Sequence, residues 1–100
     1  MIEEFLIWAT EKKAVLEKSG MLSTISTSLL SNNLSARIDI DTSVAAARIT
    51  VWESGDFHLE IIDFHSSENI YQKNLHLDKF EDFERDVGVF IEILLRDSNK

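Results

Sequence analysis

The chain has 100 residues, with 18 acidic and 10 basic side chains, a formal net charge of -8, and neither Cys nor Pro. This length predicts a single domain, residues 1–100, with one modest core. The negative charge argues against sequence-independent nucleic-acid binding and against docking on an anionic membrane surface, because both need basic side chains. It suits a basic protein partner, or simply solubility. The absence of Cys excludes disulfides, thiolate metal sites and thiol catalysis.

We expect neither an export signal nor a membrane-spanning segment in this sequence. The chain starts Met1-Ile2-Glu3-Glu4, which is acidic where a signal peptide would be basic. No apolar run approaches the ~18–20 residues that are needed to cross a bilayer. We therefore expect the protein to be cytoplasmic, and the lack of Cys fits a reducing compartment.

Residues Met1 to Lys18 have the pattern of an amphipathic helix. Apolar side chains recur every three or four positions. Glu3 and Glu4 in the first turn and Lys18 at the end suit the helix dipole. Gly20 is placed to end the helix in the left-handed conformation.

The segment from Ser19 to Ser35 is rich in Ser, Thr and Asn. Its large apolar side chains recur at helical spacing, although Ser and Thr are mediocre helix formers. We interpret the segment as a short second helix or a helical extension, followed by a loop around Asn32 and Asn33.

From Leu34 to Leu77 apolar and polar side chains alternate, which is typical of half-buried strands. Turn signals at residues 42–43, 53–56 and 65–69 divide this stretch into four strands. The order of strands and short turns predicts a four-stranded antiparallel meander.

The register of the central hairpin can be predicted from its two faces. A loop of residues 54–56 places Ile49 opposite Ile61 and Trp52 opposite His58, so that one face is apolar and the other largely polar. A two-residue loop would mix apolar and polar side chains on both faces. The glycine in the middle of the longer loop supplies the positive φ that such loops need.

The last element is an amphipathic helix. Asp78 is a good N-cap, and Glu81 three residues later completes a capping-box pattern. From Phe80 onward the apolar side chains form one stripe, and acidic side chains predominate on the opposite face.

The predicted fold is α+β, with an N-terminal helix, a four-stranded antiparallel meander and a C-terminal amphipathic helix in two layers. One face of the sheet is expected to pack under the helices while the other faces solvent. The expected core consists of Phe5, Ile38, Ile40, Ile49, Val51, Leu59, Ile61, Phe83, Val87, Phe90 and Leu94.

Groups for catalysis or metal binding are few. The pairs His58 and Glu60, and Asp63 and His65, each share a strand face, but zinc sites need three or four ligands. The sequence has neither a Gly-x-Ser-x-Gly elbow nor a glycine-rich phosphate loop. We expect no catalytic residue, no metal site and no cofactor, and the protein is not expected to be an enzyme.

Trp52 is the most informative side chain, because alternation assigns it to the polar face of the sheet. A Trp outside the core is a common binding anchor, since it combines a large apolar area with a hydrogen-bond donor. Alternatively, a loop, the Ser-rich segment or the sheet edge covers it. If exposed, Trp52 lies beside Glu53, Asp56 and Glu60, an arrangement that suits a basic protein surface.

The stretch from Arg48 to Phe57, RITVWESGDF, followed by LEIID at residues 59–63, resembles the central hairpin of the TriTu immunity proteins. In that pattern an R-I-T-V-W-x-S-G strand and turn leads into a strand with acidic residues. The order of helices and strands also fits, so the resemblance covers nearly the whole chain. It implies a bacterial immunity protein that neutralises an antibacterial toxin delivered by a type VI secretion Rhs effector. The toxin of that family is an ADP-ribosyltransferase that modifies elongation factor Tu.

On this resemblance, the chain would occlude the cofactor or substrate cleft of its toxin. The hypothesis makes Trp52 the anchor, Glu53, Asp56 and Glu60 the charge complement, and Arg48 and His58 flanking contacts. The acidic helix face from Glu81 to Glu92 is an alternative binding surface. A small acidic secretion chaperone, which would hold a partly unfolded client, is an alternative function.

Overall fold

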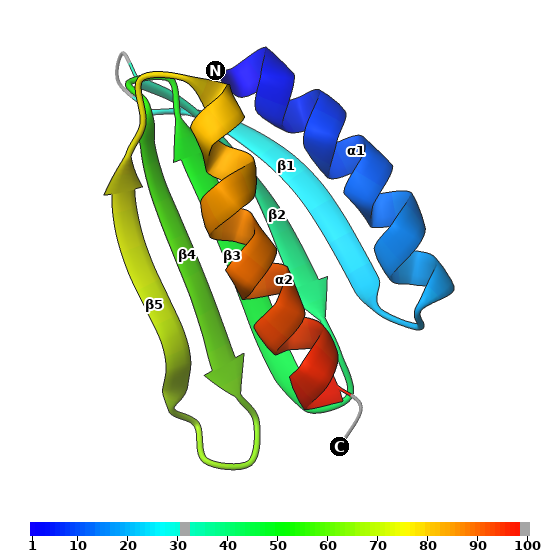
Figure 1. Cartoon of the computed structure of the whole chain (residues 1–100). Helices are drawn as coiled ribbons and strands as arrows, with labels where there is room; N and C mark the ends of the chain where they lie inside the picture. Colours follow the sequence, from blue (N-terminus) through cyan, green and yellow to red (C-terminus); the bar gives the residue numbers. More distant parts are fainter. Residues whose placement is uncertain (31–32, 99–100) are drawn as a thin grey trace.

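The computed structural model describes residues 1–30 and 33–98, and this part of the chain forms a five-stranded antiparallel sheet with two α-helices on one face (Figure 1). Each strand pairs with the next, so the strand order is β1-β2-β3-β4-β5. The two-layer α+β prediction is therefore correct, but the predicted number of strands was wrong by one. The elements are α1 (Ile2–Lys18), β1 (Leu22–Leu30), β2 (Asn33–Asp41), β3 (Ala45–Trp52), β4 (Asp56–Asp63), β5 (Asn69–His76), the 3-10 turn η1 (Phe80–Asp82) and α2 (Phe83–Ser98).

The extra strand is β1, which occupies the segment that we predicted as a second helix. β1 pairs with β2 along its whole length, from Leu22 opposite Asp41 onward. Met21 and Ser23 are buried and Ile25 is half-buried, so the inward side chains alternate along the strand. The same apolar residues also fit the period of a helix. Hydrogen bonding to the edge of β2 makes this segment a strand. Of the predicted loop, Asn32 lies outside the described residues.

The C-terminus of α1 has the hydrogen bonds of a Schellman motif, as the position of Gly20 predicts. Gly20 has φ +87°, and its N–H donates to the Glu17 carbonyl at 3.0 Å. The N–H of Met21 donates to the Leu16 carbonyl at 3.1 Å. Leu16 and Met21 are both buried, which anchors this turn in the core at the point where the chain enters β1.

The β3–β4 hairpin has a three-residue loop, as predicted, but the loop covers residues 53–55. Ile49 therefore pairs with Leu59 rather than with Ile61, and every predicted pair in this hairpin is shifted by two residues. Gly55 has the expected positive φ, +96°. Because side chains alternate with period two, a shift of two residues leaves each one on its predicted face.

α2 begins later than predicted, and Asp78 is not its N-cap. Lys79 precedes the 3-10 turn without a side-chain cap, and the α-helix starts at Phe83. The ring of Phe80 packs 5.0 Å from that of Phe83. Aromatic packing on the sheet, rather than a cap, therefore sets the start of α2. The Asp78 carboxylate lies 3.5 Å from Nε2 of His76.

The core lies between the sheet and the two helices. Every residue of the predicted core is buried, with exposed fractions of 3% or less. The inward positions of β2, β3 and β4 alternate strictly with half-buried or exposed ones. Both helices cover the same side, and no element of the described part of the chain covers the opposite face of the sheet, which is the solvent-facing side that we predicted (Figure 1).

Candidate functional site

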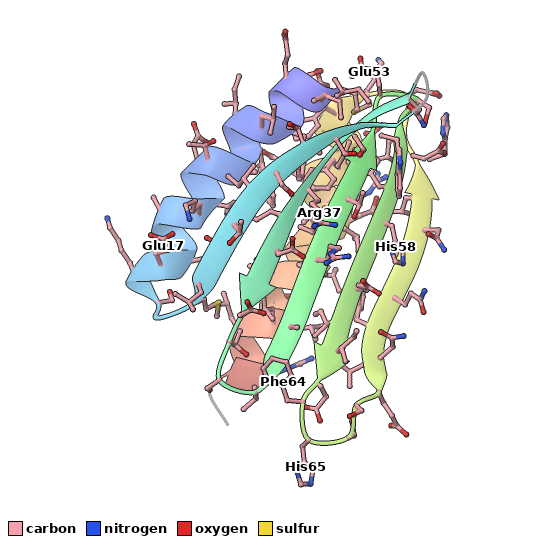
Figure 2. The ribbon with its side chains drawn as sticks, turned by 180° about the vertical axis from the view of Figure 1, so that it is seen from behind. Glu17, Arg37, Glu53, His58, Phe64 and His65 are labelled. Carbon is pink, nitrogen blue, oxygen red and sulfur yellow. The ribbon has the colours of Figure 1, made fainter. Side chains whose placement is uncertain are left out.

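The sheet face opposite the helices, here called the open face, carries most of the predicted site (Figure 2). It is formed by alternate side chains of all strands, and the strand register sets its rows. In Figure 2, Arg37 and His58 lie on this face, and Glu53 lies at the end where β3 and β4 join. Its polar and charged side chains are Thr24, Ser26, Ser28, Ser35, Arg37, Asp39, Asp41, Arg48, Thr50, Asp56, His58, Glu60, Gln72, Asn74 and His76.

Ion pairs cross the centre of the open face. Nε of Arg48 donates to Oδ1 of Asp39 at 2.6 Å, and Nε of Arg37 lies 3.2 Å from Oδ2 of the same carboxylate. The hydrogen bond to Asp39 raises the pKa of Arg48, although partial burial opposes it. Glu60 lies opposite Arg48 on β4 and adds to this effect. Pairs this exposed add little stability, but they hold the arginines in place.

Trp52 ends β3 on the open face and is half-buried. It lies opposite Ser35 of β2, at a shallow hollow of about 460 Å³ whose lining includes Ser26 and Ser28 of β1. The Ser-rich strand β1 therefore lies on the same face as Trp52, with β2 between the two. The small Ser side chains leave part of the indole accessible.

A hydrogen-bonded corner lies beside Trp52 at the β3–β4 turn. Nδ1 of His76 is 2.9 Å from Oδ1 of Asp56, and Ser54 Oγ donates to Oδ2 of Asp56 at 2.8 Å. The hydrogen bond with His76 lowers the pKa of Asp56, and the bond from Ser54 lowers it further. The same pair raises the pKa of His76, with a smaller contribution from Asp78. This corner favours an ionised carboxylate next to a protonated imidazole.

The six predicted site residues spread along the face rather than forming one cluster. Trp52, Glu53 and Asp56 lie together at the turn. His58 lies in the next row, opposite Thr50, with Nε2 3.3 Å from Nε2 of Gln72. Arg48 and Glu60 form a row beyond that.

Sequence reasoning missed the side chains that other strands contribute. Asp39 and Arg37 complete the central ion pairs, and His76 completes the corner. Alternation had placed the two β2 residues on a polar face, which is the only signal that could have found them. Nothing in the sequence indicates which residue of the neighbouring strand they face.

The described residues, 1–30 and 33–98, contain no group of three or more His, Cys, Asp or Glu side chains that could hold a metal ion. None of the helices in this part of the chain is both long and apolar enough to span a membrane. What the open face offers is a broad surface of hydrogen-bonding and charged groups around one large aromatic side chain. Such a surface suits the binding of a macromolecule.

A family model of the TriTu immunity proteins matches residues 3–93, from α1 into the last turns of α2. The chain belongs to the TriTu family. This identification agrees with the resemblance of the β3–β4 hairpin and extends it over both layers. A TriTu protein is an immunity protein rather than an enzyme, and its partner is a cognate toxin. A search of curated proteins found no match.

Proposed function

We propose that this protein neutralises an antibacterial ADP-ribosyltransferase toxin by covering the toxin's active cleft with the open face. The observation that carries the proposal is the half-buried Trp52 at the end of β3, on a largely polar sheet face that neither helix covers. The toxin class rests on the resemblance of residues 48–63 to the TriTu hairpin. An inhibitor without reactive groups has to act by occupying space that the substrate or cofactor needs.

The size of the open face is adequate for this role. Strands of eight or nine residues extend for roughly 27–30 Å, and five strands side by side span roughly 19 Å. A standard protein interface takes about 800 Å² from each partner, and a corrugated surface of these dimensions offers an area of that order. One open face can therefore support a one-to-one complex.

Charge favours a basic surface around the toxin cleft. Three acidic side chains lie on the same side of the molecule as Trp52: Glu53 and Asp56 at the β3–β4 turn, and Glu60 on β4. The whole chain has a net charge of -8. Opposite charge on the toxin would speed association and orient the two proteins before contact. Arg48 and His58 would act as flanking polar contacts next to the anchor.

The proposal is tested by calorimetry of the toxin with Trp52→Ala. Loss of a true anchor weakens binding by about 2 kcal/mol or more, which is about a thirty-fold rise in Kd. Ile7→Ala is the matched control, because Ile7 is 64% exposed on α1, in the other layer of the molecule. Circular dichroism verifies that both variants fold. Unchanged affinity of a folded Trp52→Ala protein would exclude the anchor role.

Protection of cells and exclusion of the toxin's ligands can each be measured. Co-expression should protect bacteria from the toxin, and protection should be weaker with Trp52→Ala. The purified complex should fail to bind either NAD, the ADP-ribose donor, or the protein substrate, whereas the free toxin should bind both. A complex that still binds both NAD and the protein substrate would rule out occlusion. Loss of affinity on neutralising Glu81 and Asp82 of η1, with Trp52→Ala unaffected, would move the interface to the acidic helix face.

A further inference from the structure

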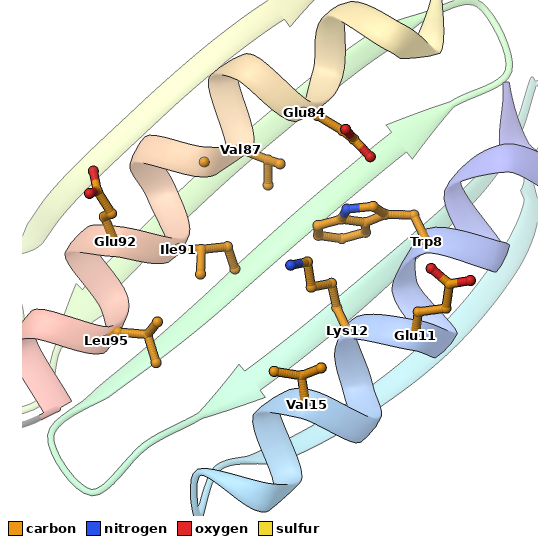
Figure 3. A pocket seen from close by; sticks show the side chains of 10 residues that line it. Trp8, Glu11, Lys12, Val15, Glu84, Val87, Ile91, Glu92 and Leu95 are labelled. Atoms are coloured by element: carbon orange, nitrogen blue, oxygen red, sulfur yellow. The ribbon is translucent and has the colours of Figure 1, made fainter.

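A groove of about 470 Å³ lies between α1 and α2 on the helix side of the molecule, away from the open face (Figure 3). The two helices meet at their N-terminal ends, where the rings of Trp8 and Phe83 are 5.0 Å apart. They diverge toward their C-terminal ends (Figure 1). Val87 and Ile91 of α2 and Trp8 of α1 give the groove an apolar lining.

Gly88 lies in the wall of this groove, in the middle of α2. Glycine in the middle of a helix is less favourable than most other residues, so we asked what this position requires of its side chain. Its φ is not in the left-handed region, and a Cβ at this position would meet nothing within 4 Å. Neither the backbone nor the packing of the chain itself therefore requires glycine. A glycine on a helix surface permits another backbone to approach closely.

The groove is also charged. Glu11, Glu84 and Glu92 lie along it with a single basic residue, Lys12, and none of these four side chains has an ion-pair partner among the described residues. Figure 3 shows Lys12 extending from α1 toward Ile91. An apolar lining with unpaired carboxylates is complementary to an apolar segment that carries positive charge. A second copy of this chain, with its net charge of -8, is a poor match.

We propose that the groove between α1 and α2 binds a cationic amphipathic α-helix of a partner protein, which crosses α2 closely at Gly88. The α2 wall runs from Glu84 to Leu95, about 16 Å or three helical turns, which is enough for such a segment. Because the groove and the open face lie on opposite sides of the sheet, both can be occupied at once.

The probe for this proposal is a synthetic 18-residue amphipathic helix of Leu and Lys. The full chain carries Trp52→Phe, so that Trp8, which lines the groove and is 7% exposed, is the only Trp that reports binding. Peptide binding should change the Trp8 emission. Gly88→Phe should fill the groove and weaken binding about tenfold or more. Val89→Phe is the matched control, because it adds the same ring to α2 outside the groove, at a position that is 50% exposed, and it should leave the affinity unchanged.

Charge variants test the same site without altering its shape. Glu84→Gln with Glu92→Gln should weaken peptide binding about fivefold or more, whereas Glu81→Gln with Asp82→Asn, which changes the net charge equally outside the groove, should have much less effect. Lys12→Gln should strengthen binding, because it removes the only basic group in the groove.

Three results would overturn the proposal. One is that the Gly88→Phe variant binds the peptide with the same affinity as the protein that keeps Gly88. Another is an equal loss from both pairs of charge variants, which would mean attraction by bulk charge alone. The third is a dimer in sedimentation experiments that Gly88→Phe abolishes, because the occupant would then be a second copy of this chain.

Discussion

Two glycines show how differently single positions constrain this chain. Gly55 has a positive φ, and a Cβ there would lie 2.5 Å from the Leu77 carbonyl oxygen, whereas a Cβ at Gly88 meets nothing. Gly55→Ala should therefore lower the free energy of unfolding by about 2 kcal/mol or more. Gly88→Ala should raise it by roughly 0.5–1 kcal/mol, because alanine is the better helix former. Urea unfolding measures both changes, and a shift of the same sign in both variants would contradict the structure.

The His76–Asp56 pair links stability to pH. The pKa of His76 is raised above 6.5, first by the hydrogen bond with Asp56, so the contribution of His76 to stability is fully present below pH 6.5 and is lost as the pH rises through the raised value. The pKa of Asp56 is lowered below 3.8, so its contribution is present above that pH and is lost as the pH falls through the lowered value. The pair therefore contributes most between these two limits.

Asp56→Asn should bring the pKa of His76 back toward 6.5, because it removes the largest of the interactions that raise it. NMR titration of the imidazole protons measures this change. Asp78→Asn is the control, and it should lower the pKa less, since Asp78 contributes less to the shift. An unchanged His76 pKa in Asp56→Asn would mean that the hydrogen bond does not persist in solution.

At the scale of elements, Phe83 joins the two layers. Its ring lies 6.0 Å from that of Phe5 and 5.0 Å from that of Trp8, both on α1, and 4.8 Å from that of Phe57 on β4. Phe83→Ala should lower the free energy of unfolding by about 3–5 kcal/mol, because it removes a fully buried ring and leaves a cavity. Chemical denaturation followed by circular dichroism measures the loss.

The control for this prediction is Phe64→Ala, which removes the same ring at a position that is 52% exposed, beyond the end of β4. Its effect should be below about 1 kcal/mol. Phe83→Leu keeps most of the buried volume and provides a measurable intermediate if the alanine variant does not fold. Equal losses at Phe83 and Phe64 would contradict the assigned core.

At the scale of the whole molecule, the charge of -8 should govern how fast the toxin is captured. The association rate constant is expected to fall about tenfold or more between low salt and roughly 0.5 M salt, because ions screen the attraction to a basic toxin. Stopped-flow mixing measures this slope. Glu53→Gln with Asp56→Asn should flatten it. A rate constant independent of salt would argue against a basic toxin surface.

Local patterns predicted most of the fold. Alternation in β2, β3 and β4 placed on the inward face residues that are buried in the structure, such as Ile38, Ile49 and Leu59, because burying one face of a sheet leaves a period of two in the sequence. Gly20 and Gly55 have the positive φ expected from their turn positions. Alternation failed to identify β1, because its apolar residues fit the period of a helix as well as that of a strand. The segment forms a strand because it pairs with the edge of β2. It also could not foresee that aromatic packing would override the Asp78 cap.

Local sequence was enough to identify the family and the faces of β2, β3 and β4, since both depend on residues that are close together in the chain. It placed Arg48, Trp52 and His58 on one polar face, and the structure agrees. The folded chain was needed to show which side chains meet, such as Arg48 with Asp39 and Asp56 with His76. These partners come from different strands, and a shift of two residues in register changes every partner while leaving every face unchanged. The groove between the helices likewise exists only because of how they pack on the sheet.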